Sequence, residues 1–151
     1  MATVNEGELD LSRLLATMEP ERQPGLFAFA TLAQGTSIDT ANCICWMREP
    51  EGLSVVIDAN CLDRLPEHTQ TTDYRAAWIT LRVHSSLAAI GLTAAIATAL
   101  SEAGISCNIV AGARHDHLFV SDAMADSALA CLRDLQARHA PPLPPQDSIR
   151  T

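Results

Sequence analysis

The chain has 151 residues, of which 48% are hydrophobic and 19% are charged, and its formal net charge is −8. This composition is typical of one globular domain or two very small ones, long enough to fold without a metal or a disulfide. All ten basic residues are arginine, and the absence of lysine excludes Schiff-base chemistry and a phosphate-binding loop that ends in lysine. The acidic charge argues against nucleic-acid partners and against an anionic membrane surface.

The beginning of the chain has no basic stretch followed by an apolar one, so the sequence predicts no signal peptide. No apolar run approaches about 18 residues, the length that a membrane-spanning helix requires. The five cysteines lack the paired spacing of a zinc site, and we expect all of them to be reduced. The sequence therefore predicts a cytoplasmic protein with no cofactor.

The first half of the chain predicts a helix followed by three strands. The helix is expected to begin near Asn5, which with Glu8 has the spacing of an N-terminal cap, and to end before Pro20. Short apolar runs bounded by glycine and proline predict strands over residues 26–31, 43–47 and 53–57, and a short helix over residues 59–65. The turn at residues 49–52 is short, so the second and third strands should form an antiparallel hairpin.

The second half predicts a strand over residues 78–83, a helix over residues 87–103, a strand over residues 105–110 and its partner over residues 117–120. A last helix follows Ser121 or Asp122, and the proline-rich residues from 140 onward predict an extended tail. This order is that of a ferredoxin-like unit without its final strand. The spare strands of the first half could complete it, so we expect an α+β fold of two interlocked ferredoxin-like units, with an antiparallel sheet and helices on one face.

Residues 84–93, between the predicted strand and helix, form the best candidate for a ligand site. A helix N-terminus exposes unpaired N–H groups and the positive end of the helix dipole, which together stabilise a small carboxylate. Gly91 has no Cβ and would let a ligand approach the backbone closely. Ser85 and Ser86 could contribute hydroxyl groups, or they could only cap the helix.

His115, Asp116 and His117 form the densest cluster of polar residues. On a strand the two histidines would share a face, where they could hold a metal together with a third ligand, contact a small molecule or make structural hydrogen bonds. We favour the structural role, because no third ligand is identifiable in the sequence. Cys61, Asp63 and His68 are the residue types of a Cys-His nucleophile system, but their nearness along the chain is no evidence that they form such a site. No catalytic residue and no metal ligand is therefore assigned.

Several stretches together resemble an ACT domain. They are residues 83–87 (Val-His-Ser-Ser-Leu), 91–95 (Gly-Leu-Thr-Ala-Ala), 103–112 and 115–120. Residues 48–53 (Arg-Glu-Pro-Glu-Gly-Leu) of the first half also resemble a small bacterial family of uncharacterised tandem ACT-like proteins. This family is related to the regulatory domains of aspartate kinase and to amino-acid sensors, and the resemblance extends to about Arg138.

The resemblance implies a degenerate N-terminal ACT-like unit over residues 1–72, a C-terminal ACT domain over residues 73–138 and a flexible proline-rich tail over residues 139–151. In the wider superfamily a free amino acid binds between paired units, against the loop after the first strand and the facing strand. Carried onto this chain, the implied ligand-binding residues are His84, Ser85, Ser86, Leu87, Gly91, Leu92, Thr93, Cys107, Asn108, Ile109 and Val110. The first half has no obvious copy of this loop.

We therefore interpret the chain as a non-catalytic regulatory protein that binds an amino acid and forms a homodimer, with neither nucleic acid nor membrane as a partner. One alternative is a structural module that dimerises without a ligand. The other, which we rank last, is a small metal-dependent or histidine-dependent enzyme that uses His84 or the cluster at residues 115–117.

Overall fold

The computed structural model describes residues 7–141, so Asn5 and most of the predicted tail lie outside the described part of the chain. The helices are α1 (Leu11–Thr17), α2 (Leu92–Glu102) and α3 (Ala125–His139). The strands are β1 (Glu19–Arg22), β2 (Phe27–Leu32), β3 (Cys43–Glu49), β4 (Gly52–Asp58), β5 (Gln70–Arg82), β6 (Cys107–Ala111) and β7 (Asp116–Ser121). Short 3₁₀ segments cover Thr40–Asn42, Ala59–Arg64 and Asp122–Met124.

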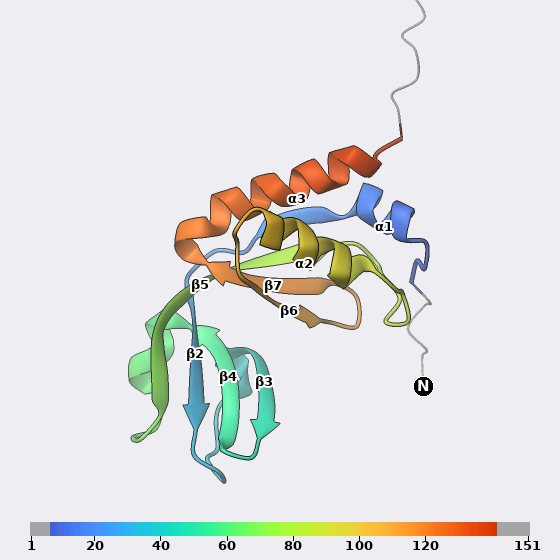
Figure 1. Ribbon diagram of the computed structural model, residues 1–151. Helices are drawn as coiled ribbons and strands as arrows, with labels where there is room; N and C mark the ends of the chain where they lie inside the picture. Colours follow the sequence, from blue (N-terminus) through green and yellow to red (C-terminus); the bar gives the residue numbers. More distant parts are fainter. Residues whose placement is uncertain (1–6, 142–151) are drawn as a thin grey trace, which may run out of the picture.

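All seven strands belong to one antiparallel sheet with the order β3-β4-β2-β5-β7-β6, and β1 also pairs with β5. Strand β5 is 13 residues long and joins the two halves of the molecule. Its first part pairs with β2, and its second part lies between β7 on one edge and β1 on the other. Figure 1 shows β5 rising from the small N-terminal sheet into the larger, helix-covered one.

The C-terminal half takes its final strand from the N-terminal half. Strand β1 occupies the edge beside β5 where a ferredoxin-like unit has its last strand, and α2 and α3 cover one face of this part of the sheet (Figure 1). Helix α1 packs on the same face, against α3. The predicted α+β fold of interlocked ferredoxin-like units is confirmed, and the interlocking element is the segment that contains α1 and β1.

The main core lies between the three helices and the sheet. Leu14 and Met18 of α1 and its C-terminal flank are fully buried there, beside residues that come almost entirely from the second half of the chain. Alternate residues of β5 and β7 face the helices, as the two-residue period of a strand requires. The fully buried core residues include Ile79, Leu81, Ile96, Leu100, Leu118 and Leu132.

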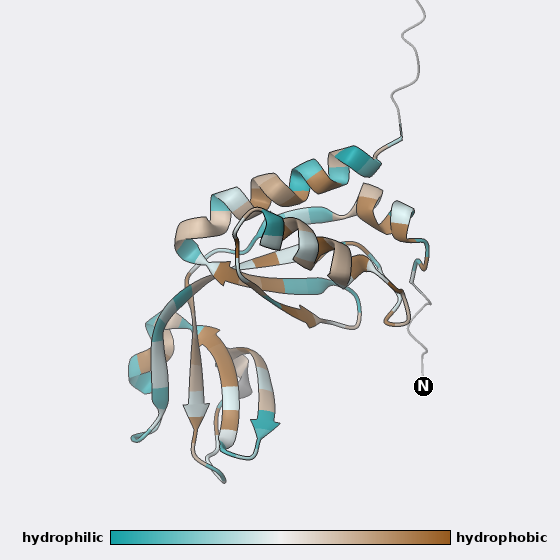
Figure 2. Ribbon diagram, viewed as in Figure 1, coloured by the Kyte–Doolittle hydropathy of each residue, from teal (hydrophilic) through white to brown (hydrophobic). Residues whose placement is uncertain are grey.

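The N-terminal half is a curled sheet of β2, β4 and β3 with a small core on each face. One core lies beside the 3₁₀ segment Ala59–Arg64 and contains Leu32 and Ile57. The other contains Phe27 and Val56 and continues into the C-terminal half through Phe119. Figure 2 shows hydrophobic colouring on parts of β4 and β6.

Three predicted starts lie at least five residues from those in the structure. The first helix begins at Leu11 rather than near Asn5, because Asp10 caps it by accepting a hydrogen bond from the Arg13 amide. Helix α2 begins at Leu92 rather than residue 87, because Gly91 has φ +102°, which a helix interior cannot accommodate. Strand β5 begins eight residues earlier than predicted, at Gln70, where polar and exposed side chains hide the strand pattern.

Candidate functional site

The candidate ligand loop, residues 84–93, follows β5 and runs into the first turn of α2. It lies beside the beginning of β7 and the end of β6, because Leu81 of β5 and Ala111 of β6 both pair with Asp116. No side chain caps the first turn of α2, and Thr93 in that turn is exposed. The backbone N–H groups of this turn are therefore available for an anion.

An N-terminal strap, residues 7–10, lies along this loop. The Glu8 amide donates to the His84 carbonyl at 2.9 Å, and the Ser86 amide donates to the Glu8 carbonyl at 3.0 Å. Gly7 packs so closely that a Cβ in its place would lie 2.4 Å from the Ser85 carbonyl carbon. The strap therefore adds a short parallel bridge at Ser85 and covers one side of the loop.

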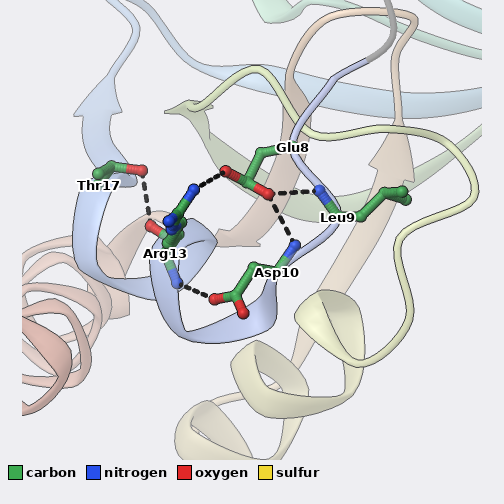
Figure 3. A network of polar contacts seen from close by, with 5 residues as sticks. All are labelled: Glu8, Leu9, Asp10, Arg13 and Thr17. Atoms are coloured by element: carbon green, nitrogen blue, oxygen red, sulfur yellow. Dashed lines mark hydrogen bonds and ion pairs between the residues drawn. The ribbon is translucent and has the colours of Figure 1, made fainter.

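The carboxylate of Glu8 fixes the strap to α1 (Figure 3). It accepts hydrogen bonds from the amides of Leu9 at 2.8 Å and Asp10 at 2.9 Å, and it forms an ion pair with Arg13 at 3.5 Å. The two backbone hydrogen bonds, with a smaller contribution from Arg13, lower the pKa of Glu8. In the same network the Thr17 hydroxyl donates to the Arg13 carbonyl at 2.7 Å.

The hollow beside Gly91 contains a side chain of the protein itself. A Cβ at position 91 would lie 2.9 Å from Cδ2 of Leu11, the first residue of α1. The Leu11 side chain therefore occupies the space that the missing Cβ of Gly91 leaves open. A ligand at α2 has to bind on the side of the helix N-terminus that Leu11 leaves open.

Ser85 and Asp116 form a buried polar pair that ties the loop to β7. The two residues are 8% and 5% exposed, and the Ser85 hydroxyl donates to Asp116 Oδ2 at 3.4 Å. Burial raises the pKa of Asp116, and the opposing effects of Ser85, His117 and His115 are smaller. Ser85 therefore faces the protein interior, whereas His84 and Ser86 of the same loop are half-buried.

The predicted strand residues divide between the two faces of β6. Cys107 and Ile109 pack toward the helices and the main core, while Asn108 and Val110 point to the opposite face, as alternation along a strand requires. Cys107 and Ile109 thus lie on the helix-covered face of the sheet. It places Asn108 and Val110 in a separate groove.

The two histidines of the cluster at residues 115–117 make different contacts. His117 Nδ1 accepts from Trp78 Nε1 at 3.1 Å and lies 3.3 Å from the Thr80 hydroxyl. Burial, and to a lesser extent His115, lowers the pKa of His117, and Asp116 opposes this effect. His115 Nδ1 lies 3.4 Å from the Val83 carbonyl. Across residues 7–141 no group of three or more histidine, cysteine or acidic side chains is arranged to hold a metal.

The groove that Asn108 and Val110 line has a volume of about 580 Å³ and lies between the two halves of the molecule. The other residues that line this groove, among them Trp46 and Met47 of β3 and Phe29 of β2, were not predicted from the sequence. The signal in the sequence was the pair Trp46 and Met47. Consecutive residues of a strand point to opposite faces, so one of these two large apolar side chains must face away from the sheet core.

Among the described residues, the helices are all too short or too polar to cross a bilayer. All five cysteines are free thiols. No curated protein sequence matches the chain.

Solved structures with a similar fold include three informative relatives. A Vibrio cholerae protein described as being of unknown function and a possible transport protein is 40% identical, with a TM-score of 0.71 over 83% of this chain and 95% of that chain. A protein from Agrobacterium tumefaciens is 19% identical, with a TM-score of 0.60 over 79% of this chain and 89% of that one. The regulatory subunit of aspartate kinase from Thermus thermophilus, 8% identical and covering 80% and 97% of the two chains, shares the fold with a TM-score of 0.59.

Two family models, both described as an ACT domain, match the chain. One covers residues 6–64 and the other residues 73–134, so together they span both halves of the molecule. These matches agree with the two interlocked ferredoxin-like units of the structure. The chain therefore belongs to the ACT domain family.

Proposed function

We propose that this chain is a non-catalytic regulatory protein that binds a free amino acid at the loop of residues 84–93. The observation that carries the proposal is the uncapped N-terminus of α2, which directly follows the left-handed Gly91 and the half-buried polar residues of the loop. Membership of the ACT family and the shared fold with an aspartate kinase regulatory subunit support this ligand class.

The α-carboxylate of the ligand would accept hydrogen bonds from the backbone N–H groups of the first turn, including that of Thr93. Helix α2 has 11 residues, long enough for the positive end of its dipole to favour an anion at this position. Because the chain has no lysine, the backbone and hydroxyl groups have to replace an ammonium group here. His84 and Ser86 are the polar loop side chains that remain partly accessible.

The proposal includes a homodimer. Leu87 and Ile90 of the loop are 73% and 87% exposed, and Leu9 of the neighbouring strap is also exposed. Large apolar side chains that gather on one surface favour association with another protein surface. A partner subunit on this surface would close the ligand site, so that ligand binding would stabilise one arrangement of the dimer and could regulate a third protein.

Free thiols are the normal state of cysteine in the cytoplasm, where we propose that the protein acts. There an amino-acid sensor meets the free amino-acid pool directly. Native mass spectrometry of freshly purified protein would report both a retained ligand and the oligomeric state.

A thermal-shift panel of the common amino acids at millimolar concentration tests the proposal. We expect at least one amino acid to raise the melting temperature. Thr93→Glu should abolish this shift, because its carboxylate would repel the ligand while remaining compatible with a helix N-terminus. Thr98→Glu makes the same change at an exposed position in the middle of α2 and should retain the shift. If no amino acid shifts the unfolding of the folded wild-type protein, the proposal is wrong.

A second function is a structural module that dimerises without a ligand. The observation that favours it is the occupation of the loop by the protein itself, through the strap and Leu11. A stable dimer in small-angle scattering, together with an amino-acid panel that causes no shift, would support this alternative.

A further inference from the structure

The groove between the two halves has a rigid apolar floor. Phe119 at its base is 1% exposed, and its ring meets Phe29 edge to face with centroids 5.8 Å apart and planes at 82°. Edge-to-face aromatic pairs of this kind hold both rings in a fixed orientation. Because Phe29 belongs to β2 and Phe119 to β7, the floor joins the two halves and is formed before any ligand arrives.

The rim of the groove presents apolar side chains that the fold leaves uncovered. Met47 on β3 is 62% exposed, and Val110 on β6 lines the same groove. Each would gain hydrophobic free energy if a ligand covered it, at about 25 cal/mol per Å² of apolar surface. The half-buried ring of Phe29 offers an aromatic surface, on which a flat ring or a cation is stabilised.

The polar lining of the groove determines which charge it accepts. It consists of hydroxyl and amide groups, including those of Thr71 and Asn108, with the carboxylate of Glu49 as the charged group. Glu49 accepts a hydrogen bond from the Ser54 hydroxyl, which holds it in place. No arginine or histidine lies among the described residues that line the groove, so an anion would meet a carboxylate without a compensating cation.

We propose that this groove is a second ligand site, for a small molecule with an aromatic or similarly flat apolar body and a neutral or positively charged end. Its volume of about 580 Å³ lies within the usual range of small-molecule pockets. The site is separate from the loop of residues 84–93, and it excludes the carboxylate for which that loop is suited. The two proposals therefore stand or fall independently.

Three probes of similar size and different charge test the proposal: 2-phenylethylamine, 2-phenylethanol and 3-phenylpropanoate. Binding is followed by isothermal titration calorimetry. We expect the amine and the alcohol to bind, and the propanoate to bind at least about tenfold more weakly because of Glu49.

Two variants locate the site. Met47→Lys places a cation on the rim and should reverse the order, so that the propanoate binds more tightly than the amine. Leu9→Lys makes the same change at a leucine of similar exposure, 59%, outside the groove, and should keep the wild-type order. Glu49→Gln should bring the amine to the affinity of the alcohol.

Equal binding of all three probes, or an order that Met47→Lys leaves unchanged, would overturn the charge selectivity and the location. Failure of every probe to bind to the folded protein would overturn the site itself. The amino-acid panel described above is run on Met47→Lys in parallel. A retained thermal shift there separates a failure of the groove proposal from a failure of the loop proposal.

Discussion

Asp116 is ionisable and almost completely buried, and its carboxyl group accepts a hydrogen bond from the neutral Ser85 hydroxyl at 3.4 Å. Burial penalises its charged form more than Ser85, His117 and His115 stabilise it, so its pKa in the folded protein lies above the ordinary value of 3.8. The stability that depends on this group is thus fully present below about pH 3.8 and is lost as the pH rises through the raised pKa. At neutral pH this carboxyl group therefore makes the fold less stable than it is in acid.

Asp116→Asn should therefore increase the free energy of unfolding at neutral pH. Asparagine keeps an acceptor for the Ser85 hydroxyl and has no charge to bury. The gain should shrink toward zero as the pH falls below 3.8, where the wild-type carboxyl group is also neutral. Urea unfolding at several pH values measures the effect. Asp134→Asn, at an exposed position of α3, serves as the control and should change little at any pH.

Gly7 is restricted by its neighbour rather than by its own backbone angles. A Cβ there would overlap the backbone of Ser85 and Ser86, at 2.4 and 2.5 Å. Gly7→Ala should push the strap off the loop and lower the free energy of unfolding by about 1–3 kcal/mol, the usual cost of overpacking. Hydrogen exchange at the Ser86 amide, which the strap protects, should become faster. Unchanged protection of that amide would show that the strap adapts.

At the scale of elements, the sequence predicted the strands and helices whose side chains follow a clear period. The hairpin of β3 and β4 and the pair β6 and β7 are confirmed, because apolar residues alternate there and glycine marks the turns. Strand β1 was missed because its sequence, Glu-Pro-Glu-Arg, is polar and contains a proline. Only pairing with β5 makes it a strand, and Pro20 is buried there.

Substitutions in and before α1 test whether this N-terminal segment stabilises the C-terminal half. Leu14 is fully buried among core residues of β5, α2 and α3. Leu14→Ala should lower the free energy of unfolding by about 2–5 kcal/mol, as expected for a leucine that leaves a cavity in a core. Leu9→Ala, five residues before the first buried position of α1, removes an exposed side chain and should cost less than about 0.5 kcal/mol. Equal effects of the two variants on denaturant midpoints would contradict this packing.

At the scale of the whole molecule, the sequence predicted that two units share elements, but it could not show which ones. Strand β5 runs through the predicted boundary between residues 72 and 73, which stays a prediction. The contact between the Gly7 strap and the loop at Ser85 joins residues that are about half of the chain apart, and it leaves no periodic pattern in the sequence. Likewise, the groove arises because the N-terminal part of the sheet curls toward the C-terminal part. This is a property of tertiary packing that a strand's own residues do not encode.

The shared strand predicts that the C-terminal half cannot fold alone. A fragment of residues 66–151 keeps β5, α2, β6, β7 and α3 but lacks the segment of α1 and β1. It would expose the β5 edge and the part of the core that Leu14 and Met18 fill. We expect no cooperative thermal transition for this fragment in calorimetry, whereas the full chain unfolds in one. A peptide of residues 7–26 should restore the transition, and the same peptide with Leu14→Ala should do so much less well. A fragment that unfolds cooperatively without the peptide would show that the ACT unit is complete without β1.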